Sequence, residues 1–252
     1  MIALLAAMSQ EIAPLRNSMK VEQKASERGC HMYKGKYRGR DVILVQTGVG
    51  RRRAQRAARL AMERYPVGAM VSFGFAGALD GRARCGDVVV CDALFCGDGE
   101  GTSKHSPASC FRADAFLTEV AARAPASADY SVLRASSVTV SRVVCEAGAK
   151  KALGQEFSAG AVDMESYWIA EIAHAQGVPF VTVRAISDAA DDTLPPFDRF
   201  MDSNGWRWGK ALPFFAGHPD QLVRLWRLRR SMRQPARNLT GVLNWLVDNV
   251  RV

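Results

Sequence analysis

Phe180-Val181-Thr182-Val183-Arg184-Ala185-Ile186-Ser187-Asp188 is the stretch of sequence that decides the fold class. Its apolar, partly β-branched residues up to Ser187 predict a buried strand. Gly177 and Pro179 precede it and end a predicted helix over 164–176. A short predicted strand over 160–162 runs into that helix. The region therefore predicts a strand–helix–strand unit.

The same alternation extends toward the N-terminus. Strands are predicted over 2–7, 41–46, 69–73, 87–91 and 132–140. Helices are predicted after the N-cap candidate Ser9 and over 51–65, 111–123 and 145–157. With 252 residues, 48% of them hydrophobic, the chain can bury one sizeable core. We therefore expect one α/β domain over residues 1–252, with a central mixed, mostly parallel sheet flanked by helices, and residues 193–252 as its helical C-terminal extension.

The positive charge is concentrated near the C-terminus. Residues 221–252 hold seven arginines and one aspartate, so 7 − 1 = +6 of the net +9 lies there. Arg51-Arg52-Arg53 begin a second basic cluster. The sequence shows no basic run interleaved with aromatic residues across a sheet, and no zinc-finger or recognition-helix pattern, so no nucleic-acid partner is expected. Solvated helix faces are the favoured interpretation, and contact between the basic C-terminal helices and a membrane surface is the alternative.

Cysteine and histidine patterns give no sign of a metal site. The six cysteines form no C-x-x-C pair and the four histidines are scattered, so neither a metal nor a cofactor is predicted. Residues 1–8 lack the basic start of a signal peptide. A cytoplasmic location with reduced thiols is expected, with peripheral attachment to the inner membrane face as its variant.

Residues suited to chemistry gather after the predicted strands, where open parallel sheets carry their sites. Glu11 follows the first strand, and Gly74-Phe75-Ala76-Gly77 is predicted as a turn after 69–73. Asp163-Met164-Glu165 stands where a strand enters a helix. Each alone has a structural explanation, such as Glu11 stabilising its helix N-terminus. Arg184 is harder to explain by structure alone, because an arginine in an apolar strand needs a partner. In a regular strand it shares one face with Asp188.

The motifs together resemble the nucleoside phosphorylase/nucleosidase superfamily, and most closely its methylthioadenosine/S-adenosylhomocysteine nucleosidase branch. The resemblance covers residues 1 to about 192. It rests on Ile2–Met8 with Glu11, Thr47-Gly48-Val49-Gly50, Gly74–Leu79 followed by Gly86-Asp87-Val88-Val89, Val162-Asp163-Met164-Glu165 and Val183–Asp188.

The resemblance implies a role for each matching residue. Asp188 would protonate the purine at N7, Glu165 would bind the ribose hydroxyls with Met164 beside the sugar, and Glu11 would activate water. Arg184 would lie in the nucleophile pocket. The further residues implied are Ser187, Val140 and Asp163 at the base and Gly48, Gly50, Phe75 and Gly77 in the nucleophile pocket. Such an acid–base pair on opposite sides of a glycosidic bond is how two carboxylates cleave it.

Water is predicted as the nucleophile in preference to phosphate. Phe75 stands where the phosphorylases carry a serine of their anion site, and Glu11 would repel a phosphate dianion. The arginines at 51–53 keep phosphorolysis open as an alternative.

The resemblance implies a purine nucleoside as the substrate, with adenine as the expected base. His218-Pro219-Asp220-Gln221-Leu222 and the arginine-rich segment after it look like the hopanoid-associated phosphorylases. That resemblance implies a lipid-linked nucleoside, adenosylhopane, and hopanoid biosynthesis. The alternatives are a methylthioadenosine/S-adenosylhomocysteine nucleosidase, a futalosine-type or other purine nucleoside enzyme, and an inactive nucleoside-binding relative. A homo-oligomer is expected from the resemblance alone.

Overall fold

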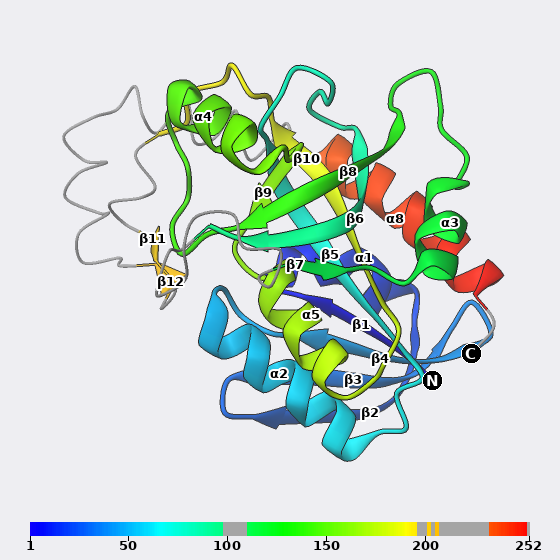
Figure 1. Cartoon of the computed structure of the whole chain (residues 1–252). Coiled ribbons are helices and arrows are strands. Elements are labelled where there is room, and N and C mark those ends of the chain that lie inside the picture. Colours follow the sequence, from blue (N-terminus) through cyan, green and yellow to red (C-terminus); the bar gives the residue numbers. More distant parts are fainter. Residues whose placement is uncertain (98–109, 196–200, 203–204, 207–231, 251–252) are drawn as a thin grey trace, which may run out of the picture.

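A computed structural model describes residues 1–97, 110–195, 201–202, 205–206 and 232–250 (Figure 1). The strands are β1 (Ile2–Ala6), β2 (Lys20–Glu27), β3 (Cys30–Tyr37), β4 (Arg40–Gln46), β5 (Ala69–Ala78), β6 (Val88–Cys96), β7 (Cys110–Arg112), β8 (Val132–Thr139), β9 (Ala161–Asp163), β10 (Phe180–Asp188), β11 (Met201–Asp202) and β12 (Gly205–Trp206). The helices are α1 (Ser9–Ser18), α2 (Arg51–Arg64), α3 (Ala115–Ala122), α4 (Ala147–Phe157), α5 (Ser166–Ala175) and α8 (Arg233–Asn249).

One mixed sheet organises the domain. Its order is β10-β6-β8-β9-β5-β1-β4-β3-β2, with β7 attached to β6, and β10 also pairs with β5. Parallel pairings join β5 to β1 and β10, and β8 to β6 and β9. Because β10 contacts both β5 and β6, the strands β5, β10, β6, β8 and β9 close a ring. This closure brings the ends of β5, β9 and β10 together.

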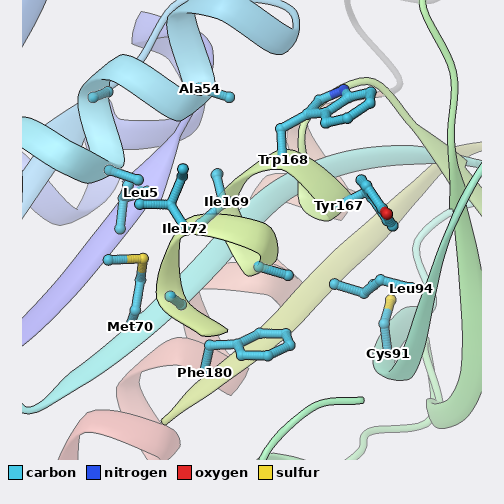
Figure 2. Packing of buried hydrophobic residues seen from close by; sticks show 14 of the residues in the cluster. Leu5, Ala54, Met70, Cys91, Leu94, Tyr167, Trp168, Ile169, Ile172 and Phe180 are labelled. Atoms are coloured by element: carbon cyan, nitrogen blue, oxygen red, sulfur yellow. The ribbon is translucent and has the colours of Figure 1, made fainter. Parts of the chain in front are cut away.

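Helices cover both faces of the sheet (Figure 1). On one face α2 and α5 pack against β1, β5 and β6. Figure 2 shows Ile172 of α5 beside Leu5 and Met70, and Ala54 of α2 belongs to the same cluster. On the other face α1, α3 and α8 cover the opposite side chains of the same strands. The strands between two helical layers are apolar on both sides, which is why their sequences read as continuous hydrophobic runs.

Four local differences from the sequence expectations have physical causes. Gly74–Gly77 is not a turn but the end of β5, where it pairs with β10. The helix expected over 111–123 begins at Ala115, because Cys110–Arg112 pairs with β6 and the Asp114 carboxylate caps the helix. Helix α1 is capped at Met8, not at Ser9, because the Glu11 carboxylate accepts the Met8 amide.

The fourth difference is the β2–β3 hairpin, which sequence reasoning missed. Its residues are charged and largely exposed along β2 at the edge of the sheet, so they lack an apolar signal.

In the C-terminal extension, helix α8 packs on the core, whereas the strand pair β11–β12 departs from the helical structure expected there. Helix α8 buries Leu239, Val242, Leu243, Leu246 and Val247, a spacing of one helical face. The Trp245 indole donates to the Val120 carbonyl at 3.0 Å. These contacts support core packing, rather than membrane contact, for this helix. The segment 218–231, which holds the most telling stretch of the hopanoid resemblance and four of the seven arginines of residues 221–252, lies outside the described residues. No helix within the described ranges has the length and apolar character needed to cross a bilayer.

Candidate active site

Arg184, on strand β10, is the centre of a buried network of polar side chains. Its Nε donates to Asp163 Oδ2 at 2.6 Å, and its Nη2 donates to Ser72 Oγ at 2.9 Å and Ser166 Oγ at 2.8 Å. Only 2% of Arg184 is exposed. Burial opposes its charge, but the neighbouring carboxylates, Asp163 first, raise the pKa of the Arg184 guanidinium. The partner that the sequence demands for this arginine is therefore Asp163.

Asp163 holds Arg184 in place. Besides Arg184, its carboxylate accepts Thr139 Oγ1 at 2.7 Å, the Ser166 amide and the Ser166 hydroxyl. These donors occupy the acceptor sites of both oxygens. The sequence predicts a base contact for Asp163, whereas its observed hydrogen bonds make it the support of the arginine.

Glu11 approaches Arg184 across Gly74. Its Oε2 accepts the Met8 amide at 2.7 Å and its Oε1 accepts the Phe75 amide at 2.9 Å. A Cβ added to Gly74 would lie 2.5 Å from Glu11 Oε1 and 3.0 Å from Arg184 Nη1. Only a glycine therefore leaves room for both the carboxylate and the guanidinium at this point. Burial raises the pKa of the Glu11 carboxyl, although the two amide hydrogen bonds oppose the rise.

Glu165 completes the carboxylate cluster. Its Oε1 accepts the amide of Gly50 at 2.8 Å, from the residue that precedes α2. Burial, and next the negative charge of Asp163, raise the pKa of Glu165 from its ordinary 4.5 to about 8. Gly50, which was predicted in the nucleophile pocket, thus donates to Glu165, the residue that was predicted to bind the ribose. Glu11, Asp163 and Glu165 therefore lie around one guanidinium, and Asp163 is the carboxylate that stabilises its charge most.

Asp188 lies at the end of β10 with its own partners. The regular pairing with β5 shifts between Ile186 and Asp188, so the face shared by 184, 186 and 188 is interrupted. Ser187 Oγ lies 2.6 Å from Asp188 Oδ1, and Lys150 donates to Oδ2. A Cβ on Gly77 would lie 3.0 Å from Oδ2, so this glycine gives the carboxylate room.

Lys150 is a site residue that sequence reasoning missed, as are Ser72, Thr139 and Ser166. A lysine followed by Lys151 in a short helix gives no local signal of burial, yet its exposed fraction is 0%.

The other predicted residues surround these groups. Met164, which stands between Asp163 and Glu165 in the sequence, is buried. The Val140 amide donates to the Asp163 carbonyl at 2.9 Å, which places the end of β8 beside the cluster. Gly48 forms the turn after β4 with φ +78°, and its amide donates to the Ala7 carbonyl. Within the described ranges, no group of three or more His, Cys, Asp or Glu side chains is arranged to hold a metal ion.

The model of a known family matches residues 1–212, and its description is the phosphorylase superfamily. The chain belongs to the phosphorylase superfamily. The superfamily match covers all the residues of the cluster described above.

Solved structures place the superfamily fold over nearly the whole chain. The methylthioadenosine/S-adenosylhomocysteine nucleosidase of Neisseria meningitidis, solved with methylthio-immucillin-A, is 23% identical with a TM-score of 0.79, covering 99% of both chains. The corresponding nucleosidase of Colwellia psychrerythraea, solved with adenine, is 21% identical with a TM-score of 0.78, covering 98% of this chain and 94% of that one. The futalosine hydrolase of Helicobacter pylori is 20% identical with a TM-score of 0.73, covering 96% and 97%. At these identities the likeness is one of fold.

Proposed function

We propose that this chain hydrolyses the N-glycosidic bond of a purine nucleoside, with adenine as its base. The observation that carries the proposal is the arrangement of Glu11, Asp163 and Glu165 around Arg184, with Asp188 nearby on the same strand as the arginine. Breaking a ribosyl–purine bond leaves positive charge on the sugar and negative charge on the base. A carboxylate-rich pocket stabilises the first, and a carboxylic acid neutralises the second.

Each carboxyl group takes one part of the reaction. Glu165 binds the ribose hydroxyls and, in its ionised form, favours the cationic sugar. Asp188 gives a proton to N7 as the C1′–N9 bond breaks and its electron pair moves to the base. A water molecule attacks C1′ and passes its proton to Glu11. This division of labour matches cleavage of a glycosidic bond by an acid and a base on opposite sides of the sugar.

The hydrogen bonds that Arg184 already makes within the protein favour hydrolysis over phosphorolysis. Its Nε and Nη2 donate to Asp163, Ser72 and Ser166, so the guanidinium lacks the open fork that binds phosphate in a bidentate way. A phosphate dianion would also meet the Glu11 carboxylate. Of the arginines that could supply an anion site, Arg51 stacks on the Trp168 ring at 4.3 Å.

For the substrate we propose adenosylhopane, a nucleoside whose 5′ substituent is a lipid. Its support is the resemblance of residues 218–222 and the following basic segment to the hopanoid-associated proteins. That segment, lying before α8, would also be the place of any peripheral membrane contact. Methylthioadenosine, S-adenosylhomocysteine and futalosine are the competing substrates. A homo-oligomeric state is part of this proposal and is measured by light scattering.

The test is release of free base from a panel of nucleosides, with and without phosphate. The panel contains adenosine, methylthioadenosine, S-adenosylhomocysteine, futalosine, inosine and adenosylhopane in detergent. Asp188→Asn is the matched control for contaminating host enzymes, and it should lower turnover by roughly 10²–10⁴-fold. Adenine released without phosphate supports the proposal. Release that requires phosphate overturns hydrolysis, and no release from any member overturns the proposed activity.

A further inference from the structure

Lys150 reaches the end of β10 from helix α4 and is fully buried. Its ammonium group donates to Asp188 Oδ2, to the Ala189 carbonyl at 3.0 Å and to the Asp192 carbonyl at 2.9 Å. A lysine ammonium has three N–H donors and no acceptor, so all of its hydrogen-bonding capacity is used. The side chain thereby joins Asp188 to the turn that follows it.

These contacts make the two oxygens of Asp188 unequal. Oδ2 is held by Lys150, which leaves Oδ1 as the oxygen open to proton transfer. Ser187 Oγ lies 2.6 Å from Oδ1 and 3.1 Å from the Ala76 carbonyl. Its hydroxyl can donate to a charged Oδ1. When Oδ1 is protonated, it can instead accept from Oδ1 and donate to Ala76. The serine therefore satisfies Oδ1 both before and after a proton leaves.

We propose that Lys150 is a positioning residue for the general acid, fixing Oδ2 of Asp188 so that Oδ1 carries the proton to the purine. This inference rests on the proposed nucleoside cleavage. In the step, the Oδ1–H bond breaks, N7 gains the proton, and the C1′–N9 electron pair moves to the base. Ser187 then turns its hydroxyl from Ala76 to the new carboxylate oxygen.

The neighbouring lysine supplies a matched control. Lys151 pairs with Asp191 on the surface, where the two side chains are 54% and 77% exposed. It is on the same helix and has the same chemistry as Lys150, but it does not reach Asp188. The Asp192 carboxylate accepts the Ala189 amide at 2.8 Å, a hydrogen bond within the turn that involves neither lysine.

The experiment compares Lys150→Met with wild type on two substrates that differ in their need for an acid. One is the adenine nucleoside that wild type cleaves best. The other is 4-nitrophenyl β-D-ribofuranoside, whose phenolate leaves without a proton. Misplacing the acid should lower kcat on the nucleoside by about 10²-fold and on the nitrophenyl riboside by less than about tenfold. Lys151→Met should leave both rates unchanged.

The outcomes separate the inference from the proposed function. Equal losses on both substrates in a folded Lys150→Met protein, or wild-type turnover of the nucleoside, overturn the positioning role while nucleoside cleavage stands. Failure of wild type itself to release adenine overturns the proposed function. If Lys150→Met does not fold, Lys150→Gln, which keeps two N–H donors without the charge, carries the same comparison and the same criteria.

Discussion

Replacing Glu165 by glutamine should change how the stability of the protein depends on pH. Glutamine keeps the acceptor for the Gly50 amide but cannot ionise. The pKa of Glu165 is raised from 4.5 to about 8 in the folded protein, chiefly by burial. Because the folded state holds this proton more tightly than the unfolded chain, the contribution of Glu165 to stability is complete below pH 4.5 and is lost as the pH rises toward 8.

The size of the effect follows from the same two values. For one group with those pKa values, linkage gives a loss of roughly 1 kcal/mol by pH 5 and about 3 kcal/mol by pH 7. Glu165→Gln escapes this loss. Its free energy of unfolding, relative to wild type, should therefore rise by about 2 kcal/mol between pH 5 and pH 7.

Urea unfolding of both proteins at pH 5, 6, 7 and 8 measures this difference, provided the m-values agree. Glu63→Gln, a change of an exposed glutamate on α2, controls for the loss of one surface carboxylate. If the free energies of unfolding of Glu165→Gln and wild type change with pH in parallel from pH 5 to 8, burial does not keep this carboxyl protonated.

Three further predictions concern the same cluster. Gly74→Ala should destabilise the fold by about 1–3 kcal/mol and lower turnover, because its Cβ would lie 2.5 Å from Glu11 Oε1; Gly81→Ala, whose Cβ meets no atom within 4 Å, is the urea-unfolding control, and equal midpoints for the two would contradict the steric argument. Asp163→Asn should lower the free energy of unfolding by about 3 kcal/mol, because it leaves the Arg184 charge buried without its partner, and an unchanged urea midpoint would show that the pair is dispensable. Glu11→Gln should reduce kcat by roughly 10²–10⁴-fold in a base-release assay, and full turnover would remove Glu11 from the role of base.

Much of the fold could be predicted from local patterns. The strands at 2–6, 40–46 and 180–188 and the helices at 51–64 and 166–175 are written as apolar runs and helical periodicity, and their observed bounds agree within about two residues. The β2–β3 hairpin was missed because its exposed edge strand needs no apolar pattern. Gly74–Gly77 was mistaken for a turn, because its glycines serve the close approach of Glu11 and Asp188 and not a change of chain direction.

For the candidate site too, the types of residue could be read from the sequence, whereas their interaction partners could not. The sequence by itself determined the kinds of residue that follow the strands, and a motif resemblance suggested roles for Glu11, Glu165, Arg184 and Asp188. Only the tertiary structure decided their partners. Glu165 accepts an amide 115 residues away, Arg184 pairs with Asp163, and Asp188 with a lysine from α4.

The physical reason is the range of the interactions. Periodicity and capping depend on neighbours within a few residues, so they are readable along the chain. Ion pairs such as Lys150–Asp188 depend on which strands close the ring and on how near a glycine lets a charged side chain come to the backbone. That information exists only once the sheet has formed.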